Sequence, residues 1–125
     1  LLFLNTDKVP LGTPYDRNSY NRIRNIISYI EEHYDSDLSL EDIAKSIHVC
    51  RSECSKLFKR FMNIPLFEFI TQYRIEKSVE YLINTNYSIM EIASLTGFND
   101  SNYFSKVFKK QKGCSPSQYR HINCS

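Results

Sequence analysis

Hydrophobic residues recur at helical spacing along most of this chain, and no stretch alternates as a half-buried strand would. The first periodic segment begins near Tyr20, and its pattern predicts a helix that ends near Asp35. A longer segment, residues 66–83, follows Pro65 and contains no internal Gly or Pro. At 1.5 Å per residue, a helix of that length is roughly 27 Å long. The apolar positions of the first segment are Ile23, Ile26, Ile27, Ile30 and Tyr34.

Two shorter segments begin with the same helix-start signal. In "LSLEDIAKSI", Ser39 is a good N-cap, and the carboxylate of Asp42 can face the free N–H groups of the first turn. In "YSIMEIASLTGF", Ser88 and Glu91 repeat that arrangement. One such signal is weak, but two that are followed by the same pattern indicate an internal repeat.

The repeat continues into a second helix in each copy. The stretch "CSKLFKR", residues 54–60, aligns with "FSKVFKK", residues 104–110. The turns before these stretches hold His48 and Gly97 at matching positions. Because Gly adopts a positive φ freely and His tolerates one, each copy is predicted to be a helix-turn-helix. Many helical domains contain such a corner, so the geometry alone leaves DNA binding and other roles open.

The pattern as a whole predicts an all-α fold of about seven helices, with two helix-turn-helix subdomains joined by a long linking helix. Residues 1–18 hold two of the four prolines and are interpreted as a linker or interdomain remnant. The expected subdomains cover residues 19–64 and 85–125, and the linking helix covers residues 65–84. A short closing helix is expected after Pro116.

Each second helix of the repeat has an apolar face and a polar face. The apolar faces carry Cys54, Leu57, Phe58 and Phe61 in the earlier copy, and Phe104, Val107, Phe108 and Gln111 in the later copy. The polar faces display Ser52, Ser55, Lys56 and Lys59 in the earlier copy, and Ser101, Asn102, Tyr103 and Lys106, with Lys109 or Lys110, in the later copy. Asn can pair with adenine, Lys with guanine, and an aromatic or methyl group can contact thymine. Such a face fits the major groove of DNA.

Positive charge is concentrated on these two helices, although the formal net charge of the chain is only +2. Residues 50–62 carry four basic side chains and one acidic side chain, and residues 99–112 have the same balance. Eight of the 16 Lys and Arg residues therefore lie in two short segments, as expected for a nucleic-acid footprint. Lysines one turn beyond the base-facing positions can reach phosphates. Lys112 is expected to be a solvated surface charge.

The remaining composition does not indicate other chemistry. Cys50, Cys54, Cys114 and Cys124 lack the paired spacing of a zinc site, and nothing indicates secretion, so free thiols are expected. No glycine-rich phosphate loop or catalytic motif is present, which argues against an enzyme, and no cofactor is expected. No apolar run reaches the roughly 18 residues of a membrane span, and a cytoplasmic protein without membrane contact is expected.

The segment from Ile23 to Arg120 resembles the C-terminal DNA-binding domain of the AraC/XylS family of bacterial transcription regulators. The most specific match is "IASLTGFNDSNYFSKVFKKQKGCSPSQYR", and "LSLEDIAKSIHVCRSECSKLFKR" and "RIEKSVEYLI" also agree. The resemblance implies a homeodomain-like fold with two subdomains that bind adjacent major grooves of double-stranded DNA. It also implies RNA polymerase as a partner through the parent protein, and an N-terminal sensor or dimerisation domain missing from this fragment, since the chain lacks an initiator Met.

The resemblance, carried over position by position, assigns base contacts to seven residues. They are Ser52, Ser55 and Lys56 in the first recognition helix, and Ser101, Asn102, Tyr103 and Lys106 in the second. Charge and helix face, rather than the family signature, indicate Arg51, Lys59, Lys109 and Lys110 as phosphate contacts. Arg74 and Arg120 match family positions that are structural as readily as DNA-contacting. Two roles stay open for Tyr103, which can contact a thymine methyl group or pack back on the turn.

Three departures from the family pattern affect the first copy. Cys50 stands where a serine usually caps the helix, and a thiol is a poorer acceptor. Asn63 replaces a glycine, which a left-handed Asn can do. Glu53 is acidic near the height of the phosphates, and Ser52 and Ser55 are short. The first copy is therefore expected to read fewer bases, and the second to carry more of the specificity.

A helical protein-interaction module is the main alternative from another class. It explains the apolar faces equally well, but it does not explain why a net charge of +3 recurs at matching positions in both copies. A zinc-supported module is a further alternative, which bound metal in a purified sample would favour.

Overall fold

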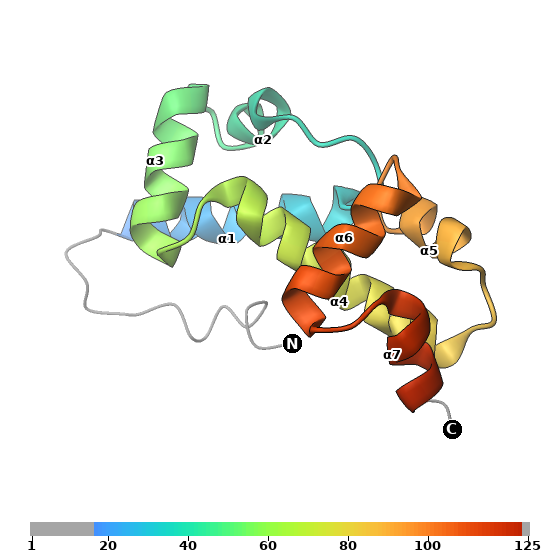
Figure 1. The fold of residues 1–125 in the computed structure, drawn as a ribbon. Helices are drawn as coiled ribbons and strands as arrows, with labels where there is room; N and C mark the ends of the chain where they lie inside the picture. Colours follow the sequence, from blue (N-terminus) through green and yellow to red (C-terminus); the bar gives the residue numbers. More distant parts are fainter. Residues whose placement is uncertain (1–16, 124–125) are drawn as a thin grey trace. The chain divides into compact units, whose positions relative to one another are not determined.

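The computed structural model describes residues 17–123, which form seven α-helices and no strand (Figure 1). The predicted all-α architecture is confirmed, and the expected long helix is present as α4. Residues 1–16 of the expected linker lie outside the described residues, and α1 begins at Arg17. The helices are α1 (Arg17–His33), α2 (Leu40–Ser46), α3 (Arg51–Met62), α4 (Leu66–Asn84), α5 (Ile89–Leu95), α6 (Ser101–Lys112) and α7 (Pro116–Asn123).

The helices fall into two compact units. Within the described residues, the first unit comprises residues 17–33 and 38–70, and the second comprises residues 34–37 and 71–123. The long helix α4 therefore begins in the first unit and ends in the second. The short segment 34–37, which follows α1 directly, belongs to the second unit.

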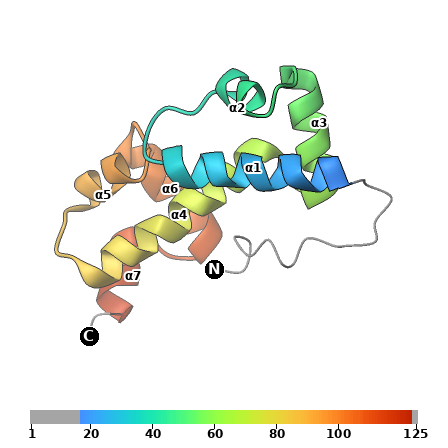
Figure 2. The same ribbon diagram turned by 180° about the vertical axis from the view of Figure 1, so that it is seen from behind.

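In the first unit, α1, α2 and α3 pack against one another (Figure 2). Isoleucine and phenylalanine side chains fill the space between them. The isoleucines of α1 recur three or four residues apart, so they form one stripe on the helix, and all four are buried. Phe58 of α3 is fully buried, and its ring meets the ring of Phe69 edge-on at 5.3 Å. The apolar face of α3 thus fixes how its opposite face is presented.

The second unit has its own core, built from α4, α5, α6 and the turn before α6. Phe104 and Phe108 of α6 are fully buried, with their ring centroids 5.8 Å apart. Phe98 packs on Phe104 at 5.1 Å, and Tyr119 of α7 meets Phe108 at 5.5 Å. The aromatic residues of this segment therefore anchor α6. Gln111, which was expected on the apolar face, is exposed.

Three helices begin with serine caps. Ser39 Oγ accepts a hydrogen bond from the amide of Asp42 at 3.0 Å. Ser88 and Glu91 form a complete capping box, in which each side chain accepts from the backbone amide of the other residue. A third box, at the start of α7, joins Ser115 and Gln118 in the same way. Sequence reasoning missed this third box, although its Ser-x-x-Gln spacing is the ordinary signal.

Candidate nucleic-acid interface

The turn between the paired helices has the same backbone in both units. The amide of His48 donates to the carbonyl three residues back, and the next amide donates to the carbonyl five residues back, both at 3.1 Å. Gly97 and the residue after it make the same two bonds, at 3.2 and 2.9 Å. His48 has a φ of 60° and Gly97 a φ of 89°, so the predicted left-handed residue is present in each turn. The turn from α2 to α3 therefore has the same conformation as the turn from α5 to α6.

The first recognition helix, α3, exposes every residue that was predicted to contact DNA. Cys54 and Phe58 on its inner face are fully buried, and Phe61 is nearly so. Its outer face carries Arg51, Ser52, Ser55, Lys56 and Lys59, all exposed. The structure therefore brings the whole predicted set of this unit to one accessible face.

The start of α3 differs from the starts of α2 and α5. Cys50 is the N-cap residue, and its side chain makes no capping hydrogen bond, as expected for a thiol.

At the other end of the helix, Asn63 is left-handed with a φ of 65°, which confirms its predicted role as a glycine substitute. Glu53 lies 3.8 Å from Arg22 of α1, measured from Oε1 to Nη1. This ion pair between α1 and α3 gave no signal in the sequence.

The second recognition helix, α6, is better capped than the first. Asp100 Oδ1 accepts from the amide of Asn102 at 2.9 Å, which holds the first turn of α6. Asn102 and Lys106 are exposed, as are Lys109 and Lys110 in the last turns, whereas Ser101 is only partly accessible. The sequence carries a signal for this cap, because Asp is a preferred N-cap residue and Asp100 directly precedes α6.

Tyr103 has a position that allows two contacts. Its ring centroid lies 6.2 Å from that of Phe98 in the preceding turn, so the side chain does pack back towards the turn. The residue is nevertheless 54% exposed. The thymine contact stays a prediction, and the contact with the turn is observed.

Lys112 is not the solvated charge that was expected. Its Nζ donates to Oε1 of Glu76 on α4, and both side chains are about three-quarters buried, with 24% and 23% exposed. The sequence could not predict this pair, because the two residues lie 36 positions apart without any motif. Lys112 is therefore a link between α6 and α4 in the second unit.

Arg74 and Arg120 have structural contacts. Arg74 donates to the carbonyl oxygens of Tyr34 and Ser36, at 2.9 and 3.0 Å, and so holds the segment 34–37 against α4. Burial lowers the pKa of its guanidinium, and the neighbouring Asp37 and Tyr103 partly oppose that shift.

Arg120 of α7 closes the end of α4. It donates to the carbonyl oxygens of Leu82 and Thr85, at 3.1 and 3.2 Å. These carbonyls are among those that the end of a helix leaves without intrahelical partners. Arg120 thus caps α4 from a distant part of the sequence.

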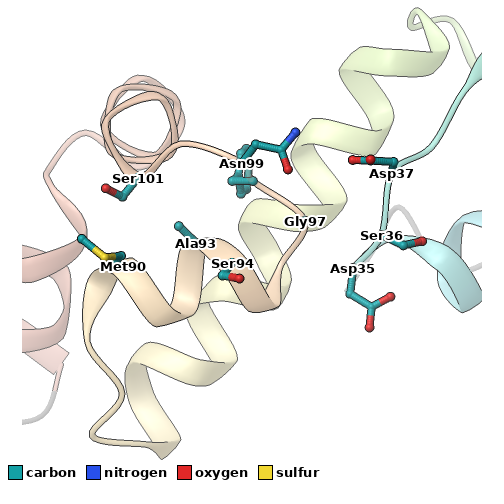
Figure 3. Close-up of a pocket in the computed structure, with 10 residues that line it drawn as sticks. Asp35, Ser36, Asp37, Met90, Ala93, Ser94, Gly97, Asn99 and Ser101 are labelled. Atoms are coloured by element: carbon teal, nitrogen blue, oxygen red, sulfur yellow. The ribbon is translucent and has the colours of Figure 1, made fainter.

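A pocket of about 420 Å³ lies beside the start of α6 in the second unit (Figure 3). The acidic segment with Asp35 and Asp37 forms one wall, and α5 with the turn after it forms the other. Ser101 lines the pocket where it meets the recognition helix. Two carboxylates give this wall the wrong sign for a phosphate, so the pocket marks the edge of the predicted DNA-facing surface.

The cysteines that the structure describes are free thiols, at positions 50, 54 and 114, and Cys124 lies outside the described residues. Burial raises the pKa of the Cys54 thiol to about 11. Among residues 17–123, no helix is long and apolar enough to cross a membrane.

Two helix-turn-helix units, each presenting an exposed face of polar and basic residues, define a class of DNA-binding proteins. Comparison with known proteins agrees with this class. A family model described as a helix-turn-helix domain matches residues 36–122. The Msm operon regulatory protein of Streptococcus mutans is 36% identical over 116 residues, which are 91% of this chain and 42% of that relative.

Solved structures give the same result. The C-terminal domain of the two-component response regulator yesN from Fusobacterium nucleatum is 34% identical, with a TM-score of 0.76 over 80% of this chain and 98% of that one. An AraC-type transcriptional regulator from Chromobacterium violaceum shares the fold at 23% identity, with a TM-score of 0.79 over 88% of this chain and 98% of that one. The chain belongs to the AraC-type helix-turn-helix family, and its function is DNA binding in transcription regulation.

Proposed function

We propose that α3 and α6 each enter a major groove of one duplex and read base edges in two successive turns. The residues that would read bases are those displayed opposite the buried faces of the two helices. The observation that carries the proposal is that all of them, with Ser101 partly covered, reach the surface on one face of their helix. They are Ser52, Ser55, Lys56, Ser101, Asn102, Tyr103 and Lys106.

The lysines and arginine around these residues would bind phosphates. Arg51, Lys59, Lys109 and Lys110 are exposed and lie on the flanks or in the last turns of the two helices. Each phosphate contact releases counterions and contributes about −0.9 to the slope of log K against log salt. Four such contacts predict a slope of about −3.6 or steeper.

The two helices would read DNA unequally. Asp100 caps α6 through its side chain, whereas Cys50 leaves α3 without a side-chain cap. The side-chain carboxamide of Asn102 can also form two hydrogen bonds with one adenine. The short hydroxyl of Ser52 cannot form such a bidentate pair. We therefore assign most of the sequence specificity to α6.

One chain would span both grooves. We take residues 19–64 and 85–125 as the two subdomains and residues 65–84 as their link. At 1.5 Å per residue, the 19 residues of α4 extend about 28 Å. Added to the bodies of the units, this length is on the scale of the roughly 34 Å that separates successive major grooves on one face of B-DNA.

The parent protein would add regulation to this DNA-binding part. The chain spans 42% of the Streptococcus mutans regulator. We propose a separate sensor or dimerisation domain, RNA polymerase as a partner of the parent protein, a cytoplasmic location and no enzymatic role for this domain.

Selection of bound sequences from a random duplex pool tests the proposal, followed by titration of the selected duplex at several salt concentrations. An enriched asymmetric site with two half-elements about one helical turn apart, and a steep loss of affinity with salt, is the expected result. Enrichment of a single half-element would mean that α3 only holds the backbone. No enrichment and no salt dependence would favour the protein-interaction module instead.

A further inference from the structure

A groove of about 400 Å³ lies between α1 and α3 in the first unit, at the edge of the predicted base-reading face. Ser52 and Lys56, which belong to that face, also line the groove. Arg60 of α3 and Arg22 of α1 line it as well, so three basic side chains border it against the single carboxylate of Glu53. The groove therefore has a local charge of about +2 and is continuous with the surface proposed to meet DNA.

The groove lies on the flank of α3 that faces α1, and none of the four predicted phosphate contacts lines it. Arg51 and Arg60 are nine residues apart, which places them on opposite flanks of a helix with 3.6 residues per turn. The flank with Arg51 faces α2, where Arg51 lines a second hollow with Lys45. The flank with Arg60 faces α1. A helix that fills a major groove has a sugar–phosphate backbone on each side, so the α1 flank needs a cation of its own.

Comparison of the two units shows why Arg22 is suited to this task. The buried residues Ile23, Ile26 and Ile30 of α1 have the same spacing as the buried Ile75, Ser78 and Leu82 of α4. Arg22 and Arg74 each stand immediately before the first residue of these sets. The two arginines are therefore equivalent positions of the duplicated unit.

The equivalent arginines have different partners. Arg74 is committed to two backbone carbonyls, and Tyr103 of α6 is near enough to influence the pKa of its guanidinium. Arg22 faces Glu53, which stands in α3 where Tyr103 stands in α6, across an ion pair of 3.8 Å. A partly exposed pair at that distance is weak. The side chain of Arg22 is 32% exposed, so a phosphate can compete with Glu53 for its guanidinium.

We propose that Arg22, with Arg60, binds a DNA phosphate in the groove between α1 and α3, and that Glu53 opposes this contact, while Lys56 keeps the base-reading role proposed above. The proposal rests on the DNA-binding mode proposed above and adds a contact from outside the recognition helix. A phosphate can displace the carboxylate of Glu53 from Arg22, because the 3.8 Å pair is long and partly exposed, whereas the phosphate can accept two parallel hydrogen bonds from the guanidinium. The contact is independent of base sequence.

Arg22→Ala in the 125-residue chain tests the contact, with Arg24→Ala as the matched control. Arg24 is on the same helix, carries the same charge and is exposed, but it is two positions further on and lies over the ring of Tyr20. Arg22→Ala is expected to weaken binding about tenfold at 0.1 M salt and to make the salt slope shallower by about 0.9. The loss should be equal for the selected duplex and for an unrelated one. Equal salt slopes for the two variants would overturn the proposal.

Glu53→Gln provides a second test that does not depend on how Arg22→Ala folds. Removal of the carboxylate should tighten binding to both duplexes, because it removes repulsion and leaves Arg22 to the phosphate. Unchanged or weaker binding would overturn the proposal. Asn102→Ala is measured alongside, and it should relax base preference whether or not Arg22 touches a phosphate. If Asn102→Ala relaxes base preference while the Arg22 and Glu53 variants show no effect, the Arg22 contact fails and the proposed function stands.

Discussion

A left-handed residue closes each helix-turn-helix corner, and the two units meet this need differently. His48 is exposed and adopts a φ of 60°, which few non-glycine residues do. Gly97 has a φ of 89°, and a Cβ placed on it would lie 2.3 Å from the carbonyl oxygen of Tyr34. The second corner therefore needs glycine for space as well as for conformation, because the segment 34–37 packs directly on it.

Gly97→Ala is expected to destabilise the protein much more than Gly113→Ala. Gly113 has a similar φ of 85°, but no atom lies within 4 Å of a Cβ placed there. Gly113→Ala should therefore lower the free energy of unfolding by only about 1–2 kcal/mol, which is the cost of a left-handed backbone in a residue with a Cβ. Gly97→Ala adds the displacement of a backbone carbonyl. Urea unfolding of both variants measures the difference, and equal losses would show that the segment 34–37 moves aside freely.

Cys50→Ser is expected to stabilise α3. Cys50 has the extended backbone of an N-cap, with φ −80° and ψ 164°, but lacks the capping hydrogen bond that Ser39 and Ser88 make. A serine there should add roughly 0.5–1 kcal/mol to the free energy of unfolding. Cys114→Ser makes the same chemical change away from a cap position and should have little effect. Thermal unfolding that shows the same shift for both variants would contradict the capping argument.

Native alkylation should distinguish Cys50 from Cys54. Cys50 is exposed, whereas Cys54 is fully buried and its thiol has a pKa of about 11. Burial disfavours the thiolate, which is the reactive form, so Cys54 should stay unmodified at pH 8. Mass spectrometry after iodoacetamide treatment should find Cys50 labelled in the native protein and Cys54 labelled only in urea. Rapid labelling of Cys54 without urea would mean that α3 opens locally.

At the scale of helices, arginines from distant segments hold the second unit together. Arg120 of α7 donates hydrogen bonds to carbonyl oxygens at the end of α4. Arg74, in the middle of α4, donates hydrogen bonds to carbonyl oxygens of the segment 34–37. Each guanidinium bridges two carbonyl oxygens, which uses the fixed fork of its N–H groups. These arginines stabilise the scaffold that presents α6.

Arg120→Ala should reduce stability without changing the way the protein reads DNA. Loss of hydrogen bonds from a charged donor to the end of α4 should lower the free energy of unfolding by about 2 kcal/mol. Arg120→Lys should recover only part of that loss, because an ammonium cannot reproduce the planar fork. Urea unfolding and the salt slope of DNA binding are measured together. A slope shallower by a full phosphate contact would instead place Arg120 on the duplex.

At the scale of the whole molecule, one chain carries two copies of the same unit with different outer faces. Asn102 occupies the position in α6 that Ser52 occupies in α3, and both are exposed. The duplication lets each substitution in one copy be compared with the matched position of the other. It also makes an asymmetric binding site the natural expectation for a single chain.

Asn102→Ala and Ser52→Ala test the proposed inequality of the two units. Asn102→Ala should lose about 1–3 kcal/mol of base discrimination at its position in one half-element. Ser52→Ala should change discrimination less, since a lone hydroxyl pairs with several bases. Selection from a random duplex pool with each variant measures both. Lost preference from Ser52→Ala, or from Lys56→Ala, with no effect of Asn102→Ala, would reverse the assignment.

Much of this molecule follows from local sequence. The helices, the caps at Ser39 and Ser88, the corner residues His48 and Gly97, and the division of α3 into two faces were all predictable. Each depends on residues within about one turn of each other, so spacing alone carries the information. The exposed faces of α3 and α6 were predictable for the same reason.

The partners of the long charged side chains were not predictable, and only the tertiary structure decided them. Lys112 looked like one more basic residue of the footprint, but it is paired with Glu76 on another helix. Arg22 and Arg74 occupy equivalent positions, yet one faces a carboxylate and the other binds backbone carbonyls. A flexible side chain takes whichever partner the fold places beside it, and that partner can lie 30 or 40 residues away. The sequence determined the helices and their faces, because these depend on neighbours along the chain, and the fold determined which charges remain for DNA.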